Sequence, residues 1–486
     1  MFKTTAARAC RIVSNSRKLH KTCRLSTENQ GENPIRRTLR ILRDDIKLIK
    51  RPANEEDYRR MLDREFPRFC DVVIIGGGAM GSSIAYWLKE KTGVDGIRVV
   101  VVEEDNTYKT CSTALSVGGL RQQFSLQENI QMSLFGAEFL RTLKKRFGPD
   151  ADVNFHPNGY LLLSSEAGAQ QLIDNSKLQT ELGAVNMVLT KNQIKERFPW
   201  MDVDDVAVGC LGLEKEGWFD PWSLLTVLKN GAHKKGAQYI NAKAVDFVFQ
   251  NREDIIVEGV EQGNYEAINE LVVEMPNGER RTIQFAYCII AAGCKSKEIA
   301  EKARIGTGSG MLSLSLPVEK RKRYVYTFSC RENAPTLNTP MVVDYTHMYF
   351  RREGLGDTFI AGMSPEPEDE PPTDDLEVDY SYFDEKIWPV LVKRVPAFEC
   401  IKVNGGWSGF YEYNTYDMNG IIGPHPYYTN LYLATGFSGH GIQQAPAVGR
   451  AISELILDGN FQTIDLTRLG FDRFIVEKPM FELRIV

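Results

Sequence analysis

The sequence predicts a two-lobed α/β protein, in which one sheet is doubly wound and parallel and the other is mixed and mainly antiparallel. Apolar runs at 71–75, 99–102 and 287–293 are typical of buried parallel strands. A helical pattern follows the first run, and a strand, a turn and a helix return at 430–457. Because the chain leaves the parallel sheet and comes back to it, the two lobes are expected to interleave along the sequence.

Each predicted lobe is built from separated segments. The doubly wound lobe is assigned to three of them: 70–125, 205–300 and 400–460. The mixed-sheet lobe is assigned to the two that lie between: 126–204 and 301–399. A C-terminal tail is expected over 461–486, and the acid- and proline-rich stretch at 365–379 is expected to be an exposed loop.

Composition and charge exclude several classes of protein. The 486 residues include 59 basic and 64 acidic side chains, which gives a formal net charge of -5 and no overall basic footprint for nucleic acid. The nine cysteines show no C-x-x-C spacing, so neither a zinc site nor any other metal site is predicted. No apolar run reaches the roughly 18 residues of a membrane-spanning helix.

The N-terminal residues 1–27 hold seven Lys and Arg and no Asp or Glu, among Ala, Ser and Thr. This composition predicts a mitochondrial presequence, and hence a protein of the mitochondrial matrix; a basic terminus without a targeting role is the alternative. The next segment, 28–69, is expected to be a basic linker. Within it, Ile and Leu recur with helical spacing at 36–50, so this stretch makes a peripheral contact with the inner membrane, contacts a partner, or packs on the body.

A glycine-rich turn follows the first predicted strand. Gly76, Gly78 and Gly81 have the G-x-G-x-x-G spacing that opens a helix in dinucleotide-binding units. The first makes the tight turn, the second lets the backbone approach a diphosphate, and the third lets helix and strand pack closely. The helix N-terminus supplies N–H groups for the phosphates. Glu103 ends the next strand, where its carboxylate can accept hydrogen bonds from a ribose.

The C-terminal part of the chain distinguishes FAD from NAD. A second glycine-rich turn, with Gly436, Gly439 and Gly441, follows an apolar strand and opens another helix. A flavin needs such a return to the nucleotide sheet because its ring lies far from its diphosphate, and a helix N-terminus stabilises negative charge at the ring. Another strand-like run ends at Gly293, where a larger side chain would block a cofactor. The sequence therefore favours FAD.

These pieces together resemble the superfamily of FAD-dependent D-amino-acid, glycine and sarcosine oxidases, over residues 70–460. The resemblance rests, in order, on VVIIGGGAMGSSIAYWL, VVVVEED, CSTALSVGG, CIIAAG and ATGFSGHG. It implies a two-lobed FAD-dependent oxidoreductase fold, with a Rossmann-like FAD-binding lobe and a mixed antiparallel substrate lobe. A mitochondrial branch of the superfamily is similar in RQQFS, GWFDPW, RKRYVY, YFRREGLG and GFSGHGIQQAP. This second similarity implies complex I assembly intermediates as partners.

Carried over position by position, the resemblance assigns a cofactor site. The residues expected to hold FAD belong to the two turns and to segments near them: Gly76, Gly78, Gly81, Glu103, Ser112, Thr113, Val245, Gly293, Gly436, Gly439 and Gly441. Ser112 and Thr113 fall where a hydroxyl meets the diphosphate or the ring, and Val245 falls where a strand presents its backbone to adenine. For the outlying residues, a role in packing alone is the alternative.

Departures from the superfamily's pattern limit the chemistry. Relatives attach flavin through a His or a Cys at two positions that are Leu115 and Gly409 here, so non-covalent, dissociable FAD is expected. An Arg that binds the substrate carboxylate is replaced in the region of Phe410 and Tyr411, and a Lys after the second turn is replaced by Gln443. The anion clamp at those positions is therefore missing, and an electron acceptor other than oxygen is expected.

Arg121 and His440 are the candidate catalytic residues. By resemblance, Arg121 contacts substrate or flavin and His440 lies in the turn that faces the ring; a surface ion pair and a structural turn are their alternatives. The resemblance implies oxidation of a small amine or amino-acid derivative. Other strand residues could line a pocket or belong to the core: Tyr324, Tyr326, Tyr349 and Arg351. An assembly protein that keeps FAD as a folding element is the second functional hypothesis.

Overall fold

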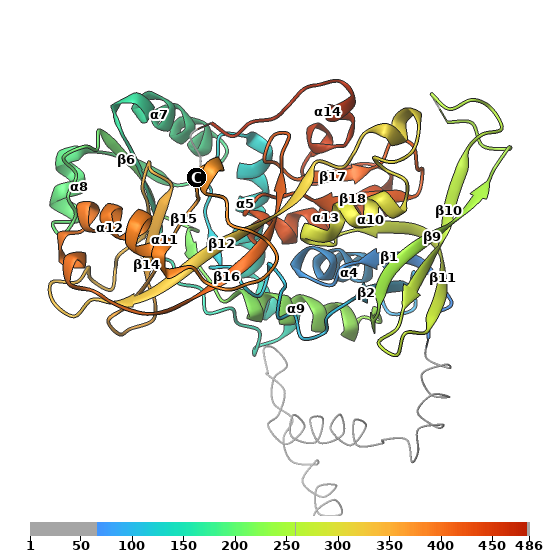
Figure 1. Cartoon of the computed structure of the whole chain (residues 1–486), viewed down its shortest axis with the longest axis horizontal. Coiled ribbons are helices and arrows are strands. Elements are labelled where there is room, and N and C mark those ends of the chain that lie inside the picture. The colour runs from blue at the N-terminus through green and yellow to red at the C-terminus, as the bar shows by residue number, and fades with distance from the viewer. Residues whose placement is uncertain (1–65, 258, 484–486) are drawn as a thin grey trace, which may run out of the picture. The chain divides into compact units, whose positions relative to one another are not determined.

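The structure is a computed structural model that describes residues 66–257 and 259–483 (Figure 1). The expected presequence at 1–27 and the helical stretch at 36–50 lie outside the described residues. The described residues form two eight-stranded sheets and one two-stranded ribbon. In this part of the chain, none of the helices combines the length and the apolar character that crossing a membrane requires.

The first sheet is the doubly wound one, with the strand order β17-β18-β11-β1-β2-β8. Its eight strands are β1 (Phe69–Ile75), β2 (Val99–Glu103), β8 (Gln238–Asn241), β9 (Lys243–Asn251), β10 (Glu266–Glu274), β11 (Arg280–Ile290), β17 (Ile421–Pro424) and β18 (Leu431–Thr435). β18, β11, β1, β2 and β8 run parallel, whereas β17, β9 and β10 are antiparallel additions at the sides. The central strands are continuous runs of Val and Ile because helices bury both of their faces.

Four helices pack around this sheet: α4 (Ala79–Thr92), α5 (Gln127–Arg141), α9 (Pro221–Lys234) and α13 (Gly441–Asp458). α4 packs against both α9 and α13, and α13 packs also against α5. The contact between α4 and α13 is close, since a Cβ at Gly449 would lie 2.2 Å from Ser83 Oγ. The helices that open at the two glycine-rich turns therefore lie against each other, although about 360 residues separate the turns in sequence.

The second sheet has the strand order β16-β12-β15-β14-β13-β4-β6-β5. Its strands are β4 (Tyr160–Ser164), β5 (Asn186–Thr190), β6 (Val208–Gly212), β12 (Val318–Ser329), β13 (Met341–Val343), β14 (Met348–Arg352), β15 (Thr358–Met363) and β16 (Lys402–Asn414). Aromatic side chains dominate its core: Phe328 stacks on Phe359, with ring centroids 5.6 Å apart, and Phe398 meets Phe350 edge to face.

Shorter elements complete the described part. The ribbon pairs β3 (Gly119–Leu120) with β7 (Gly217–Trp218). The other helices are α6 (Leu143–Phe147), α7 (Glu166–Glu181), α8 (Lys191–Arg197), α10 (Ser296–Lys302), α11 (Tyr380–Tyr382), α12 (Trp388–Arg394) and α14 (Asp472–Ile475). Single tighter or wider turns are η2 (Gly293–Lys295), η3 (Gly310–Ser313), η4 (Pro367–Asp369), η5 (Phe383–Ile387), η6 (Pro396–Cys400) and η7 (Thr467–Leu469).

The lobe boundaries differ from the predicted ones at three elements. β6 and β16 fall inside the predicted doubly wound segments, but they pair with β4 and β12 in the second sheet. α5 falls inside the predicted mixed-sheet segment, but its Met132, Ala137 and Phe139 belong to the core of the doubly wound lobe. Strand pairing and helix packing with residues far along the chain decide to which lobe an element belongs. Local periodicity predicts neither the pairing nor the packing.

The predicted C-terminal tail is ordered against the body over the part that the structure describes. Leu466, Leu469 and Phe471 are fully buried. Leu466 and Leu469 belong to the same core as α4 and α13, so the chain does not leave the doubly wound lobe after α13. The prediction of a C-terminal tail is therefore wrong for residues 461–483.

Candidate active site

Residues of both sheets line a cavity of about 740 Å³. The carboxyl ends of β1, β2 and β11 reach it, through Ile75, Glu103 and Ala291. From the second sheet, β12, β14 and β16 contribute Arg323, Tyr349 and other side chains. Ligands of open α/β sheets bind beyond the carboxyl ends of the strands, and cofactor sites commonly measure about 300–1,000 Å³. The cavity therefore has the place and the size of a cofactor site.

The first glycine-rich turn brings a helix N-terminus to this cavity. Gly76 has a φ of +102°, and a Cβ there would lie 2.3 Å from the Ala291 oxygen. A Cβ at Gly81 would lie 1.9 Å from the Gly76 oxygen, so Gly81 permits the packing and does not itself line the described cavity. Gly78 is the N-cap of α4 and does line it. Apart from the Ala79 N–H, which donates to Thr113 Oγ1, the N–H groups and the partial positive charge of the first turn of α4 are thus available to phosphates.

Glu103 is held at the edge of the cavity by two backbone donors. Gly77 N–H donates to its Oε2 at 2.7 Å, and Asp105 N–H donates to its Oε1 at 2.9 Å. Burial raises the pKa of Glu103, and the two N–H groups oppose that shift. Each carboxylate oxygen keeps a further lone pair after these bonds, which suits it to accept from the two hydroxyls of a ribose.

The hydroxyl residues after β2 also reach the cavity. Thr113 Oγ1 accepts from the Ala79 N–H at the start of α4, at 3.1 Å, and Ser112 lies beside it in the lining. The assignment of Val245 differs by a few positions. In the described part of the chain, Ala242, Lys243 and Ala244 line this end of the cavity and Val245 does not.

The second glycine-rich turn opens on the same cavity. Gly439, His440 and Gly441 line it, and α13 begins at Gly441 with the uncharged first turn GIQQ. Gly293 lines it as well, at a φ of +55°. Among the described residues, Gly436 is not part of the lining; its φ of +76° shapes the turn behind it. Two helix N-termini thus meet one cavity, as a molecule with a diphosphate and a ring that gains negative charge requires.

The two candidate catalytic residues meet in this cavity. Arg121 NH2 lies 3.2 Å from His440 Nε2, and the guanidinium lies 5.1 Å from the centre of the Phe124 ring. The Arg121 backbone N–H donates to Gln443 Oε1 at 2.8 Å. Burial lowers the pKa of Arg121, but a guanidinium keeps its proton at physiological pH. Since arginine can only donate, His440 Nε2 accepts, and the hydrogen of a neutral ring lies on Nδ1.

A model of the DAO family, described as FAD dependent oxidoreductase, matches residues 71–455. The chain belongs to this family. It is 47% identical to the FAD-dependent oxidoreductase domain-containing protein 1 homolog of Drosophila melanogaster, over 94% of each chain. It is 48% identical to FAD-dependent oxidoreductase domain-containing protein 1 of Xenopus laevis, over 86% of this chain and 85% of that one.

Solved structures share the fold of this family. The L-proline dehydrogenase from P. horikoshii aligns with a TM-score of 0.70 and 24% identity, over 85% of this chain and 100% of that one. The likeness at this identity concerns the fold. The two-lobed α/β architecture predicted from the sequence is therefore confirmed.

FAD is the cofactor of the DAO family, and the cavity fits it. The first turn and α4 would offer donors to the diphosphate, Glu103 would accept from the ribose, and the second turn would hold the ring. At the positions where relatives bond the flavin, Leu115 and Gly409 face each other, since a Cβ at Gly409 would lie 3.1 Å from Leu115 Cβ. Neither residue can form that bond.

The nearest thiols are also unreactive. Cys111 and Cys294 line the cavity, and burial raises the pKa of both, that of Cys294 to about 11. A thiol is nucleophilic as the thiolate, so these two remain protonated and inert near neutral pH.

Four tyrosine and arginine positions on the strands separate into two groups. Among the described residues, Tyr349 lines the cavity, whereas Tyr324, Tyr326 and Arg351 do not. Tyr324 and Tyr326 pack in the aromatic core of the second sheet, and Arg351 lies over the Trp218 ring. The core alternative therefore holds for three of the four.

Sequence reasoning missed several cavity residues. Tyr160, in the buried strand YLLLS, lines the cavity within 6.0 Å of the Arg121 guanidinium, measured to its ring centre. Glu216 lies behind Arg121: it accepts from the Gln122 N–H at 2.7 Å, and burial raises its pKa to about 7. Nothing in the local sequence separates Tyr160 from a core tyrosine or Glu216 from a surface glutamate.

Glu412, on β16, is a partly buried carboxyl between the turn at Gly293 and the second glycine-rich turn. The Thr435 hydroxyl lies 3.1 Å from its Oε2, and the N–H groups of Gly436 and Phe437 also donate to it. Burial raises the pKa of Glu412 to about 7, and these donors oppose the rise. A Cβ at Gly293 would lie 3.6 Å from Oε2. A group that titrates near neutral pH therefore lines the cofactor cavity.

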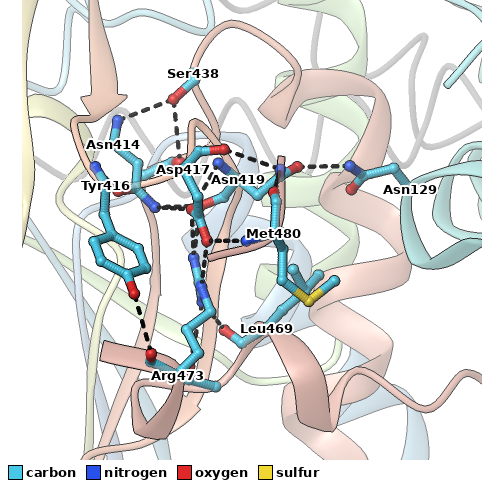
Figure 2. Close-up of polar contacts among 11 residues, drawn as sticks. Asn129, Asn414, Tyr416, Asp417, Asn419, Ser438, Leu469, Arg473 and Met480 are labelled. Carbon is cyan, nitrogen blue, oxygen red and sulfur yellow. Dashed lines mark hydrogen bonds and ion pairs between the residues drawn. The ribbon is translucent and has the colours of Figure 1, made fainter. Parts of the chain in front are cut away.

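A polar network behind the second turn ties it to the C-terminal segment (Figure 2). The Asn414 N–H donates to Ser438 Oγ at 2.9 Å, and Asn414 Nδ2 donates to Asp417 Oδ1 at 2.9 Å. Asp417 forms a buried ion pair with Arg473, with Nε and Oδ2 2.7 Å apart, and accepts from the Met480 N–H at 3.1 Å. The segment after α13 thus positions the second glycine-rich turn, whose Ser438 lines the cavity.

The same segment also fixes the start of α5. Glu482 Oε2 accepts from the Ser125 N–H at 2.6 Å, and Glu482 Oε1 accepts from Asn129 Nδ2 at 2.6 Å. Ser125 follows Arg121 by four residues. The segment after α13 therefore holds both the stretch that carries Arg121 and the second glycine-rich turn. A carboxylate at a helix N-terminus is favoured by the unpaired N–H groups there.

Glu412 makes the stability of the protein depend on pH. Its pKa in the folded state, about 7, lies above the value near 4.3 of an unfolded glutamate, so its contribution is complete below the lower value and is lost as pH rises through 7. Between about pH 4.5 and 7, we expect the free energy of unfolding to fall on the order of 2–3 kcal/mol further in the wild type than in Glu412→Gln. Urea unfolding at each pH measures this. Exposed Glu196→Gln should retain the wild-type slope, and equal slopes for wild type and Glu412→Gln would contradict the assignment.

Arg473→Gln leaves Asp417 as a buried, unpaired charge. We expect it to lower the free energy of unfolding by about 3–5 kcal/mol. The double variant Asp417→Asn/Arg473→Gln, which removes both charges, should recover part of that loss and still bind FAD on the order of tenfold more weakly, because Asn414 and Ser438 lose their support. The Kd comes from flavin fluorescence quenching. Lys478→Gln, an exposed residue of the same segment, is the control. An unchanged Kd in the double variant would show that the network is structural only.

Proposed function

We propose that the protein is a mitochondrial FAD-dependent oxidoreductase that oxidises a small amine or amino-acid derivative. The observation that carries this proposal is the meeting of Arg121 and His440 beside the second glycine-rich turn, in the cavity that fits FAD. When bound, FAD supplies the acceptor for a hydride from the carbon beside an amine nitrogen. The protein then has to bind, orient and desolvate the substrate.

Arg121 provides the fixed positive charge for this task. Its backbone is held by Gln443, and its guanidinium lies between His440 and the aromatic rings of Phe124 and Tyr160. This enclosure strengthens any interaction with an anionic or polar substrate group, because little water is present to screen it. Gln443 occupies the position of the expected Lys, so it places an uncharged amide there. We therefore propose that electrons pass to an acceptor other than oxygen.

The proposal includes the matrix and complex I assembly intermediates as location and partners. The basic, acid-free composition of residues 1–27 supports import into mitochondria. The resemblance of RQQFS, GWFDPW and RKRYVY to a mitochondrial branch of the family supports the partners. A peripheral contact of residues 36–50 with the inner membrane belongs to the same proposal.

A second candidate is an assembly protein that keeps FAD with little turnover. The missing clamp at Phe410, Tyr411 and Gln443 favours it, since relatives place cations in these regions to hold a substrate carboxylate. Under this reading FAD stabilises the fold by binding only the native state.

Non-covalent binding predicts that denaturation releases the flavin. Acid-precipitated protein should leave a yellow supernatant and a colourless pellet, because Leu115 and Gly409 offer no atom for a bond and the nearby thiols are protonated. Absorbance of both fractions, with the mass of the intact denatured chain, measures this. Flavin that stays with the pellet and adds to the mass of the chain would contradict it.

Oxidation of an amine predicts bleaching of the flavin absorbance without oxygen. At least one of sarcosine, dimethylglycine, proline and the D-amino acids should bleach it in stopped-flow mixing, and Arg121→Gln should slow the reaction on the order of 100-fold with the FAD content unchanged. Arg141→Gln, an exposed arginine on α5, is the control. If none of these compounds bleaches the flavin and complex I intermediates co-purify with the protein, the second candidate replaces the first.

A further inference from the structure

An acid-rich loop lies against a row of cations at the cavity. We call residues 364–379 the acidic strap; Ser364, at its start, lines the cavity. Three consecutive residues of β12 pair with its carboxylates: Arg321 and Arg323 with Glu370, and Lys322 with Asp375. Its later part is also tied down, because Ser408 Oγ donates to the Leu376 oxygen.

Arg323 belongs to the cavity and to the strap at once. It lines the cavity, and its NH1 and NH2 donate to the two oxygens of Glu370 at 2.8 and 2.9 Å. NH2 donates in addition to the Tyr411 hydroxyl at 2.8 Å. Among the described residues, the buried Nε–H of Arg323 has no acceptor. Arg323 therefore forms a complete anion site. Its NH1 and NH2 groups already bind a carboxylate of the chain itself, and its Nε–H remains unused.

This anion site lies next to the second glycine-rich turn. A Cβ built at Gly439 would lie 4.0 Å from the Tyr411 ring, whose hydroxyl contacts Arg323. In the ladder between β12 and β16, Arg323 pairs with Gly409 and Lys322 pairs with Phe410. The region of β16 where relatives carry the carboxylate-binding Arg therefore has a cation directly across the ladder.

Glu370 is ionised and only partly enclosed. Burial alone would raise its pKa, but hydrogen bonds and charge from Arg323 and Arg321 hold the pKa below its usual value. The side chains of Glu370 and Arg323 are 22% and 21% exposed. Water reaches both side chains, so another carboxylate can approach and compete for the same fork. Arg321 NH1 also donates to Glu370, at 2.7 Å, so Glu370 has to leave both arginines for the strap to open.

We propose that Glu370 is a built-in stand-in for the substrate's carboxylate: an entering carboxylate takes its place on Arg323, and the acidic strap opens at Glu370 as it binds. Arg323 has a carboxylate partner before and after the exchange, so its guanidinium is never left as a charge without a partner. Arg323 then selects carboxylate-bearing substrates, and Glu370 rejects weakly binding anions by competition. This inference rests on the proposed oxidation of an amino-acid derivative, since it supplies the cation that the usual clamp positions lack.

The test titrates the FAD-loaded protein with benzoate and follows the change in flavin absorption. Glu370→Gln should lower the Kd for benzoate about tenfold, because the competing carboxylate is gone. Arg323→Gln should raise it at least tenfold, and Arg323→Lys, which keeps the charge without the fork, should fall between. Asp369→Asn is the matched control, since Asp369 lies on the same strap but pairs with Lys386. Benzamide, the uncharged counterpart of benzoate, should respond to none of these changes.

Strap opening has a second readout in limited proteolysis. Benzoate should speed cleavage within 364–379 of the wild type, and benzamide should not. The proposal is overturned if Glu370→Gln leaves the Kd for benzoate within twofold of wild type, if benzamide tightens equally, or if neither protein binds benzoate. If the benzoate experiment contradicts the strap proposal while an amine still bleaches the flavin, only the strap proposal is wrong. If benzoate binds as expected but no amine bleaches the flavin, the proposed amine oxidation is wrong and the proposed anion site stands.

Discussion

The active site depends on backbone coming closer to backbone than any side chain allows. Gly76 and Gly81 lie so near their neighbours that a Cβ would overlap an oxygen, and that contact aims the first turn of α4 at the cavity. Gly449 then lets α13 lie against α4, which brings its own first turn to the same cavity. These two helix N-termini offer N–H groups and partial positive charge to a diphosphate and a flavin ring without an ionisable side chain.

Enclosure gives the ionisable side chains of the cavity unusual properties. Glu412 lines the cavity and Glu216 lies behind Arg121; burial raises the pKa of both carboxyls to about 7, and Arg121 is a buried guanidinium close to Glu216. A protein keeps such groups only where hydrogen bonds compensate the lost water, as backbone donors do for both glutamates. Their concentration around one cavity is typical of functional sites.

The substrate side is built differently from the cofactor side. The cofactor side uses backbone groups and the carboxyls Glu103 and Glu412, whereas the other side uses charged and aromatic side chains from strands. Arg323 shows the difference, because its partners Glu370 and Tyr411 come from a loop and from a neighbouring strand. Such a surface can change its specificity through side chains while the helix N-termini stay in place. The C-terminal segment supports both sides, through Arg473 and Glu482.

The sequence by itself determined the parts of this protein that local rules govern. The spacing of Gly76, Gly78 and Gly81 indicates a phosphate-binding turn because only glycine permits those contacts, and Glu103 follows from the position at which the next strand ends. Arg121 and His440 were found through resemblance, and the tertiary structure brings them within hydrogen-bond distance. It also placed β6, β16 and α5 in lobes other than those predicted, and it revealed Glu412 and the pairing of Arg323 with Glu370. These features depend on contacts between residues far apart along the chain, which no local pattern of residues encodes.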